Sequence, residues 1–344
     1  MKKDIKSLTI EEMTAQFKEL SLPKFRAEQV FKWLHQEGVS SFDEMTNLSK
    51  PLRSQLAEIY QINGCEIFEK YVSKIDSTVK YVFSLHDGEF VESVVMKYKY
   101  GYSICVSSQV GCKMGCKFCA STLAGFCRNL SAGEILSQIY TASKDLDIKI
   151  SHIVMMGIGE PLDNFDNVMR FLELVNCDKG LNISMRNISL STCGVVPRIY
   201  DLMDRKLQLT LSISLHAPND EIRSRTMPVN NKWHIDELIK ACKDYTKVTG
   251  RRISFEYTLI DGVNDSEECA NELATRLHGM LCHVNLIPVN NVEENNFNKS
   301  SNKNITVFAN MLKKRGINAT IRRTLGSDIN ASCGQLRRRA SQKR

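Results

Sequence analysis

The segment that decides the fold is Ser103–Cys119, SICVSSQVGCKMGCKFC, in which a short strand-like run leads into three cysteines. Cys112, Cys116 and Cys119 follow a C-x3-C-x2-C spacing. Soft thiolate ligands this close together suit an iron–sulfur or a zinc centre. A structural zinc or a fully ligated cluster takes four protein ligands, and no fourth cysteine follows at pair spacing. Three thiolates would hold a [4Fe–4S] cluster with one iron open to a substrate, although the pattern alone also leaves zinc open.

Helix-like and strand-like segments alternate through most of the chain. The strand of residues 103–108 comes first, and each of the later strands follows a predicted helix. About seven strands joined by helices are typical of a parallel sheet with βα crossovers, and therefore of an α/β protein. Active sites of such folds lie at the carboxyl ends of the strands, which is where the cysteines fall. The predicted helices cover residues 132–145, 164–175, 196–204, 234–248, 267–279 and 304–315.

Smaller regions flank this alternating core. The first of them looks like a set of short amphipathic helices, and Thr9 and Glu12 have the spacing of a capping box. The next alternates like a β-hairpin with a turn at Asp87-Gly88. The predicted domains are a helical accessory, RNA-binding domain (1–62), a β-hairpin extension (63–100), the catalytic core (101–336) and a basic tail (337–344).

The composition limits the class of protein. A chain of 344 residues, 42% hydrophobic and 25% charged, can bury a full core. No apolar run follows the basic N-terminus, and no stretch reaches the roughly 20 apolar residues of a membrane span. Twelve cysteines without a secretion signal favour metal binding or thiol chemistry in a reducing compartment. We therefore expect a cytoplasmic protein that does not associate with a membrane.

The positive charge is concentrated at the C-terminal end. The net charge is +7, and residues 313–344 hold ten lysines and arginines against one acid, Asp328. The rest of the chain holds 36 basic and 38 acidic residues, so the whole excess lies in this segment. Such an end favours a polyanion such as nucleic acid as partner. A solvated tail is the alternative, but the presence of Cys333 in the same segment favours the first interpretation.

Several motifs extend the pattern around the cysteines. The cysteine spacing, with an aromatic residue before the last cysteine, resembles the radical S-adenosylmethionine superfamily. Over about two thirds of the chain, the sequence resembles the bacterial dual-specificity ribosomal and transfer RNA adenine-C2 methyltransferases. This resemblance implies a partial (βα)6 TIM-like barrel with a small N-terminal helical domain. The motifs occur in the order CVSSQVGCKMGCKFC, GFCRNL, VMMGIGEPL, LSTCGVVP, ISLHAPND, HVNLIP and DINASCGQL.

The resemblance also implies a cofactor set. One [4Fe–4S] cluster per chain would bind the amino and carboxylate groups of S-adenosylmethionine through its open iron, and two molecules of S-adenosylmethionine would be consumed per methylation. The residue types fit, because glycines allow close backbone approach and a carboxylate accepts bonds from an ammonium group. Small polar groups at strand ends suit a ribose or an adenine edge. The implied S-adenosylmethionine contacts are Gly159, Glu160, Ser191, Ser214, Leu215, His216 and Asn290.

Three further residues receive catalytic roles from the resemblance. Cys333 lies in a small, polar loop that we predict to be exposed and mobile, which makes its thiol available for chemistry. The family pattern makes it the methyl carrier, because adenine C2 is electron-poor and cannot attack a sulfonium methyl. Cys105 alone would be a buried small hydrophobe; the pattern makes it the thiol that releases the product by forming a disulfide with Cys333. Glu92 matches the family's proton acceptor.

Departures from the family pattern are few. Ile158 replaces the usual Met of the Gly-x-Gly-Glu motif, and Val289 stands where a Trp is common. Neither change removes a reacting group. Arg128, Arg322 and Arg323 could contact phosphate or be ordinary surface arginines. The remaining cysteines are predicted to be incidental or semi-buried thiols: Cys65, Cys127, Cys177, Cys193, Cys242, Cys269 and Cys282.

The resemblance predicts C2 methylation of adenosine 2503 in 23S rRNA and of adenosine 37 in a subset of tRNAs. It also predicts an electron donor such as flavodoxin or ferredoxin and a monomeric enzyme. One alternative is the sister family, which methylates C8 of the same rRNA adenine and confers antibiotic resistance; the GEPL motif, against GEAL in that family, favours C2. The other alternative is a zinc-bearing RNA-binding module, which would leave the GIGEPL and ISLHAP motifs and the Cys105/Cys333 pair unexplained.

Overall fold

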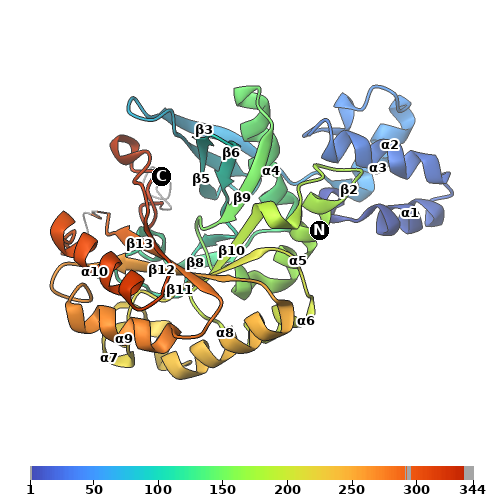
Figure 1. Cartoon of the computed structure of the whole chain (residues 1–344). Coiled ribbons are helices and arrows are strands. Elements are labelled where there is room, and N and C mark those ends of the chain that lie inside the picture. The colour runs from blue at the N-terminus through green and yellow to red at the C-terminus, as the bar shows by residue number, and fades with distance from the viewer. Residues whose placement is uncertain (1, 291, 293–295, 337–344) are drawn as a thin grey trace.

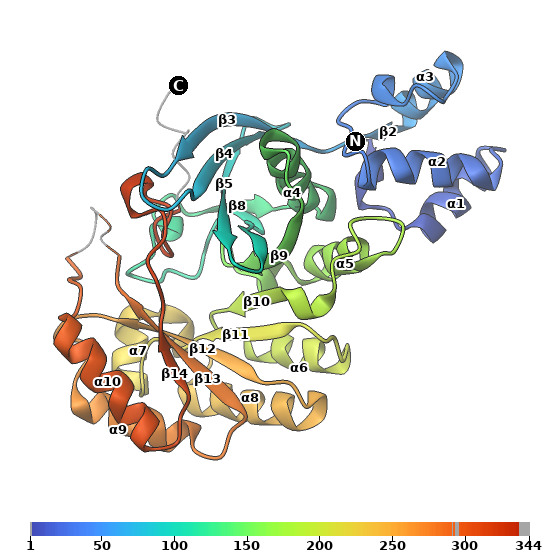
Figure 2. The ribbon, with the colours of Figure 1, turned by 45° about the horizontal axis from the view of Figure 1, so that its top comes forward.

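The centre of the molecule is one ten-stranded sheet with helices on its outer side (Figures 1 and 2). The computed structural model describes residues 2–290, 292 and 296–336, so the predicted tail 337–344 lies outside the described residues. The strand order is β14-β13-β12-β11-β10-β9-β6-β5-β4-β3. Among the described strands the two edges do not pair with each other, so the sheet is an open, partial barrel of the predicted class.

Seven strands form the parallel part of this sheet, and they correspond to the seven that the sequence predicts. Every residue of the β12 strand is buried, although apolar and polar residues alternate along its sequence ISFEYTL, because such strands are covered on both faces. The parallel strands are β6 (Gly101–Cys105), β9 (Ile150–Met155), β10 (Ile188–Thr192), β11 (Thr210–Ser214), β12 (Ile253–Leu259), β13 (Cys282–Pro288) and β14 (Ala319–Ile321).

Helices join the parallel strands and cover their outer face. The α4 helix begins with a capping box between Ser131 and Glu134, which satisfies backbone donors at its first turn. None of the described helices is long and apolar enough to cross a membrane. The connecting helices are α4 (Ala132–Leu146), α5 (Phe165–Asn176), α6 (Val196–Asp204), α8 (Ile235–Thr249), α9 (Glu267–Leu277) and α10 (Asn302–Lys314).

The predicted hairpin is part of a three-stranded antiparallel extension. Gly88 has a φ of +81° and its N–H donates to the Leu85 carbonyl over 3.0 Å, which confirms the turn at Asp87-Gly88. The last strand of the extension pairs antiparallel with β6, so the extension continues the main sheet. Its strands are β3 (Cys65–Val72), β4 (Val79–Leu85) and β5 (Phe90–Tyr98).

The N-terminal helices pack at one end of the sheet against α4 (Figure 2). The capping box of Thr9 and Glu12 is present as predicted. His35 Nδ1 and the Tyr140 hydroxyl lie 2.9 Å apart. Lys6 Nζ donates to Ser137 Oγ over 3.0 Å. These buried polar contacts fix the position of the helices, which are α1 (Ile10–Glu19), α2 (Lys24–His35) and α3 (Lys50–Ile59), together with the strand pair β1 (Lys3–Asp4) and β2 (Tyr60–Gln61).

Three short elements around the cysteines are not predicted by the sequence pattern, because they are too short to show a period. The strands β7 (Gln109–Gly111) and β8 (Phe126–Asn129) pair antiparallel and enclose the cysteine loop. A Cβ at Gly111 would lie 1.8 Å from the Gly125 carbonyl oxygen, so only glycine fits there. The helix α7 (Asp220–Thr226) packs beside the same loop. The 3-10 helices are Ile5–Ser7, Phe42–Glu44, Ala120–Thr122, Pro161–Asn164, Met185–Asn187, Pro228–Asn231 and Ser327–Ile329.

Candidate active site

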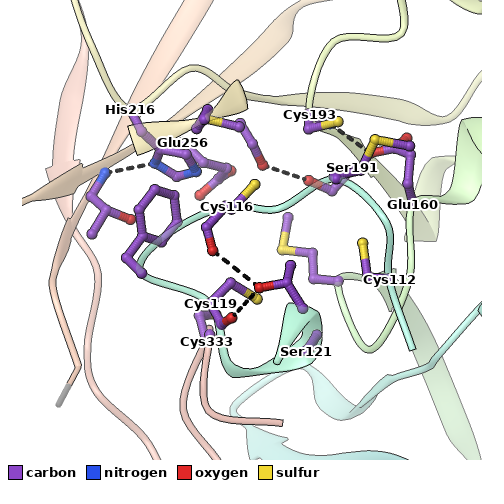
Figure 3. Close-up of a pocket in the computed structure, with 18 of the residues that line it drawn as sticks. Cys112, Cys116, Cys119, Ser121, Glu160, Ser191, Cys193, His216, Glu256 and Cys333 are labelled. Carbon is purple, nitrogen blue, oxygen red and sulfur yellow. Dashed lines mark hydrogen bonds between the residues drawn. The ribbon is translucent and has the colours of Figure 1, made fainter. Parts of the chain in front are cut away.

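A cavity of about 950 Å³ lies at the carboxyl ends of the parallel strands, the position expected for an active site in this class of fold. Figure 3 shows the three motif cysteines around one space, with Glu160 and Cys193 on one side and His216 and Glu256 on the other. The lining includes most of the residues that the sequence singles out: Cys112, Cys116, Cys119, Gly159, Glu160, Ser191, Ser214, His216, Asn290 and Cys333.

The cysteine loop is held in place by its own hydrogen bonds. The Cys119 N–H donates to the Cys116 carbonyl over 3.1 Å. The Thr122 hydroxyl contacts the carbonyl oxygens of both residues, at 3.3 and 3.0 Å. The Lys117 N–H donates to the Thr226 carbonyl over 2.9 Å, which ties the loop to α7. The three cysteines are therefore presented by one compact turn.

The chemistry of these thiols fits a positively charged metal core. Burial and, to a smaller extent, the charge of Cys119 raise the pKa of Cys112 to about 12. Burial also raises the pKa of Cys116 and Cys119. Three thiolates can coexist there only with compensating metal charge. Within the described residues no three His, Cys, Asp or Glu side chains surround a single ion; a [4Fe–4S] cluster instead binds each thiolate through a different iron, so its ligands stand apart.

Glu160 is fixed by backbone donors. Its Oε2 accepts from the Cys193 N–H over 2.7 Å and its Oε1 from the Leu162 N–H over 3.0 Å. Burial raises the pKa of this carboxyl, while these bonds lower it. Gly159 has a φ of +106°, and a Cβ there would lie 2.6 Å from the Gln109 side chain. The backbone thus requires glycine beside an anchored carboxylate, each of whose oxygens can accept a further bond from a ligand.

His216 presents a neutral ring to the cavity. Its Nδ1 accepts from the Thr258 N–H over 2.9 Å, so the ring proton is on Nε2, which is a donor. Burial and then the charge of Arg223 lower the pKa of His216 to about 3. The edge of the ring packs on Phe118, with centroids 4.8 Å apart. The φ of His216 is +55°, a conformation that few residues adopt.

Of the remaining predicted S-adenosylmethionine contacts, three line the cavity and one does not. The hydroxyls of Ser191 and Ser214 lie 3.4 Å apart at the ends of β10 and β11. Asn290 Nδ2 donates to the Cys333 carbonyl over 2.9 Å. Leu215 is fully buried and packs in the main core, outside the lining. Only the backbone of Leu215 is therefore placed near the site.

The loop that carries Cys333 is less exposed than the sequence suggests. Its polar first half is open to solvent, but Ala331, Ser332 and Leu336 are buried. The Ala120 N–H donates to the Gly334 carbonyl over 2.8 Å. The prediction of an exposed loop therefore holds for its first half and is wrong for its second half, because small residues pack that half against the cysteine loop. Cys333 itself is partly exposed and lines the cavity.

Cys105 lies outside the lining but beside Cys333. It is buried among Val94, Ile158 and Leu336 in a small apolar cluster that also contains residues of the Cys333 loop. Burial and, to a smaller extent, the charge of the nearby Cys333 raise the pKa of Cys105 to about 12. Neither cysteine is in a disulfide. The structure thus brings the two predicted reactive thiols into one neighbourhood.

Glu92 is buried on β5, on the same side of the strand as Val94. Its Oε1 lies 3.9 Å from Lys80 Nζ, and both side chains are 1% exposed. Lys80 also donates to the Asn330 carbonyl over 3.3 Å. Glu92 is therefore linked through one cation to the loop that carries Cys333.

Sequence reasoning missed three residues that shape the cavity wall, Arg223, Cys193 and Glu256, of which the last two line the cavity. Arg223 is fully buried and donates to the carbonyls of Cys193 (2.6 Å) and Leu215 (3.2 Å) and to Asn230 Oδ1 (3.1 Å). No carboxylate of a described residue lies within 4.0 Å of it. Cys193, predicted to be an ordinary semi-buried thiol, lines the cavity and holds Glu160. Only its position after a strand could have signalled this, and nothing in the charged segment around Arg223 signals burial.

The three arginines that could contact phosphate differ in exposure and in their contacts. Arg128 is engaged with Asp87 and Glu134, at 2.6 and 2.9 Å, between the hairpin and α4. Arg322 lines the cavity. Only Arg323 is an exposed side chain.

The open barrel and the three-cysteine loop define a radical S-adenosylmethionine enzyme, and the model of the "Radical SAM superfamily" matches residues 106–273. The "Ribosomal RNA large subunit methyltransferase N-terminal domain" model matches residues 3–62. The chain belongs to the RlmN family of dual-specificity RNA methyltransferases.

Relatives in this family match over nearly their whole length. The chain is 53% identical to the probable dual-specificity RNA methyltransferase RlmN of Clostridium novyi over 336 residues, 98% of each chain. It is 55% identical to that of Alkaliphilus oremlandii, again over 98% of each. A crystal structure of a radical SAM methyltransferase from Sphaerobacter thermophilus is 41% identical and superposes with a TM-score of 0.93, covering 97% of this chain and 99% of that one.

Proposed function

We propose that this enzyme methylates C2 of adenosine in RNA, at adenosine 2503 of 23S rRNA and adenosine 37 of a subset of tRNAs. The observation that carries the proposal is the placement of Cys333. It lines the cavity shared by the three motif cysteines, and Cys105 lies behind it. A methyltransferase that only positioned a nucleophile against a sulfonium would need neither thiol.

Cys112, Cys116 and Cys119 would hold the [4Fe–4S] cluster. Glu160, the Ser191–Ser214 pair, His216 and Asn290 line the space beside them and would orient S-adenosylmethionine. When bound, the cluster and S-adenosylmethionine would supply a methyl group and a 5′-deoxyadenosyl radical. The buried walls exclude water from the reacting atoms.

The two thiols would then carry the carbon. Cys333 takes the methyl group as a thioether, and removal of one hydrogen atom leaves a carbon radical that adds to adenine C2. The adduct radical would then give up its C2 proton and one electron, which would return to the cluster, so that the aromatic ring is restored before the thioether is broken. The Cys105 thiolate attacks the Cys333 sulfur, the sulfur–carbon bond breaks, and the carbon leaves with the electron pair to become the product methyl group on protonation. The thiols end as a disulfide. Glu92, held beside this loop through Lys80, would accept the C2 proton.

The partners follow from this chemistry. The substrates would be 23S rRNA and tRNA, bound in part by the basic C-terminal segment and the N-terminal helices. A flavodoxin or ferredoxin would supply the electron, and the enzyme would act as a cytoplasmic monomer.

The test is anaerobic turnover of reconstituted enzyme with RNA, S-adenosylmethionine and reductant, followed by mass spectrometry of the nucleosides. The expected products are 5′-deoxyadenosine and 2-methyladenosine. 8-Methyladenosine would instead assign the enzyme to the C8 reaction, and the absence of 5′-deoxyadenosine would contradict the radical reaction altogether.

A further inference from the structure

One buried carboxylate oxygen in the cavity accepts no hydrogen bond from the part of the chain that the structure describes. Glu256 lies on β12, is 3% exposed and lines the cavity. Its Oε1 accepts from Ser254 Oγ over 3.2 Å and from Asn285 Nδ2 over 3.0 Å. Its Oε2 is buried, and no described residue donates a hydrogen bond to it. Leaving a buried acceptor unsatisfied costs free energy, so its presence in a reactive cavity points to a ligand that brings a donor.

A donor group stands next to that oxygen. Arg322 Nη1 lies 3.8 Å from Glu256 Oε2, which is too long for a hydrogen bond. The same nitrogen contacts Met156 Sδ, a weak acceptor, at 3.6 Å. A guanidinium has five N–H donors, so Arg322 keeps donors for a further partner. The cavity therefore offers an acceptor and a donor side by side.

Glu256 and Arg322 line the same cavity as Cys333. A second cavity of about 390 Å³ adjoins the first, and Arg322, Asn290 and Cys333 line both. Tyr98 and Leu325 line the second cavity only, and they give it an aromatic and apolar wall. A planar base entering from this side would reach the Arg322 and Glu256 pair with its edge.

We propose that Glu256 and Arg322 bind the Watson–Crick edge of the target adenine, with Glu256 Oε2 accepting from the exocyclic amine and Arg322 donating to N1. This inference rests on the proposed function and deepens it by naming the residues that select the base. Adenine carries a donor and an acceptor side by side on this edge, whereas guanine and hypoxanthine would turn a carbonyl oxygen toward the carboxylate. Ring atom N1 is bonded to C2, so this edge brings C2 to the Cys333 side, whereas binding through N7 would bring C8.

The proposal can be tested on the wild-type holoenzyme with base analogues. Short RNA hairpins would carry adenine, 1-deazaadenine or 7-deazaadenine at the target position, and competition would measure their affinities anaerobically. Loss of N1 is expected to weaken binding about tenfold, in the range of one good base contact, while loss of N7 leaves it unchanged. Equal affinities, or a loss confined to the 7-deaza analogue, would overturn the proposal. Binding is measured because removing a ring nitrogen also changes the reactivity of C2.

The variant Glu256→Gln tests the carboxylate separately. Since Ser254 and Asn285 donate to Oε1, the amide oxygen is expected to stay there, and the amide NH2 would face the base. Affinity for the adenine hairpin should fall about tenfold, and the preference for adenine over hypoxanthine should narrow or reverse. The control Glu268→Gln, exposed on α9, should change neither.

The outcomes separate the two proposals. Absorbance near 400 nm and S-adenosylmethionine affinity report whether the variant keeps its site, and the analogue series on wild-type enzyme does not depend on the variant folding. A wild-type enzyme that prefers adenine through N1 but makes no methylated RNA would contradict the proposed function and support this inference. A wild-type enzyme that methylates RNA while binding all analogues equally would support the proposed function and contradict this inference.

Discussion

The two walls of the cavity are built in different ways. The wall behind the cysteine loop is a dense hydrogen-bond network, in which both Glu160 oxygens and the buried Arg223 guanidinium bond mainly to backbone. A second part of the wall is the Cys333 loop, which lies over a small apolar cluster that contains Cys105. Hydrogen bonds tie it to the hairpin extension through Asp328 and to the cysteine loop through Gly334 and Leu336. A rigid wall suits the binding and orientation of a cofactor, because catalytic geometry must be preorganised. The second wall is a loop rather than a set of strand ends, and loops suit a thiol that must reach a methyl donor, a base and a second thiol in turn.

The largest effect is expected on the rigid wall. Cys119→Ala removes one of only three ligands, so the protein should fail to assemble its cluster and lose all activity. Absorbance near 400 nm and iron and sulfide analysis after reconstitution would measure this. The matched control is Cys127→Ala, which removes an exposed thiol and should leave both iron content and turnover at the wild-type level. A Cys119 variant with full iron content would contradict the assignment of the ligands.

In the Cys333 loop, Cys333→Ala should separate cluster assembly from methyl transfer. The variant is expected to keep its cluster and to make no methylated RNA, because the methyl carrier is missing. Nucleoside mass spectrometry together with iron analysis reads out both properties. Normal amounts of 2-methyladenosine from this variant would rule out the two-thiol mechanism.

Cys105→Ala should block a later step than Cys333→Ala. The carbon can still be attached to the base, but no thiol can attack the Cys333 sulfur, so a covalent protein–RNA adduct should accumulate. Denaturing gels with labelled RNA would detect the adduct, and RNase treatment should remove the shift. If the variant turned over freely without an adduct, Cys105 would have no role in release.

A smaller effect is expected for Arg223→Met, because this arginine ties strand ends together without contacting the reacting atoms. Its loss leaves buried carbonyls unsatisfied and should lower the free energy of unfolding by about 3 kcal/mol. Urea denaturation measures the change. Arg225→Met, an exposed arginine on the same helix, should change stability by less than about 0.5 kcal/mol. Equal effects of the two variants would contradict the structural role of Arg223.

The smallest effect concerns pH. Burial lowers the pKa of His35 and of His216 to about 3, so the folded protein keeps both rings neutral where the unfolded chain binds protons. Their contribution to stability is complete above about pH 6.5 and is lost as the pH falls toward 3. Lowering the pH from 7 to 5 should lower the free energy of unfolding by about 2 kcal/mol for each of the two histidines. Urea titrations of wild type and His35→Gln at both pH values should show a smaller pH effect in the variant, whereas the exposed His278→Gln should match wild type.

The sequence could predict the parallel sheet, because seven buried strands and their helices show clear periods and the helix ends carry capping signals such as Ser131 and Glu134. It could also predict the cysteine loop and the strand-end residues, since their spacing and order are local. It did not reveal Arg223 and Glu256, because their burial depends on segments that meet only in the folded chain. The burial of the second half of the Cys333 loop could not be predicted for the same reason. Small polar residues are typical of an exposed loop, and the sequence does not show that the cysteine loop packs on them.

The account depends most on a cluster held by three cysteines with one iron free for S-adenosylmethionine. Mössbauer spectroscopy of ⁵⁷Fe-reconstituted enzyme tests this most directly. The expected result is a [4Fe–4S] spectrum in which one iron site changes when S-adenosylmethionine is added. Four iron sites that do not respond to S-adenosylmethionine, or a protein that takes up zinc and no iron, would contradict it.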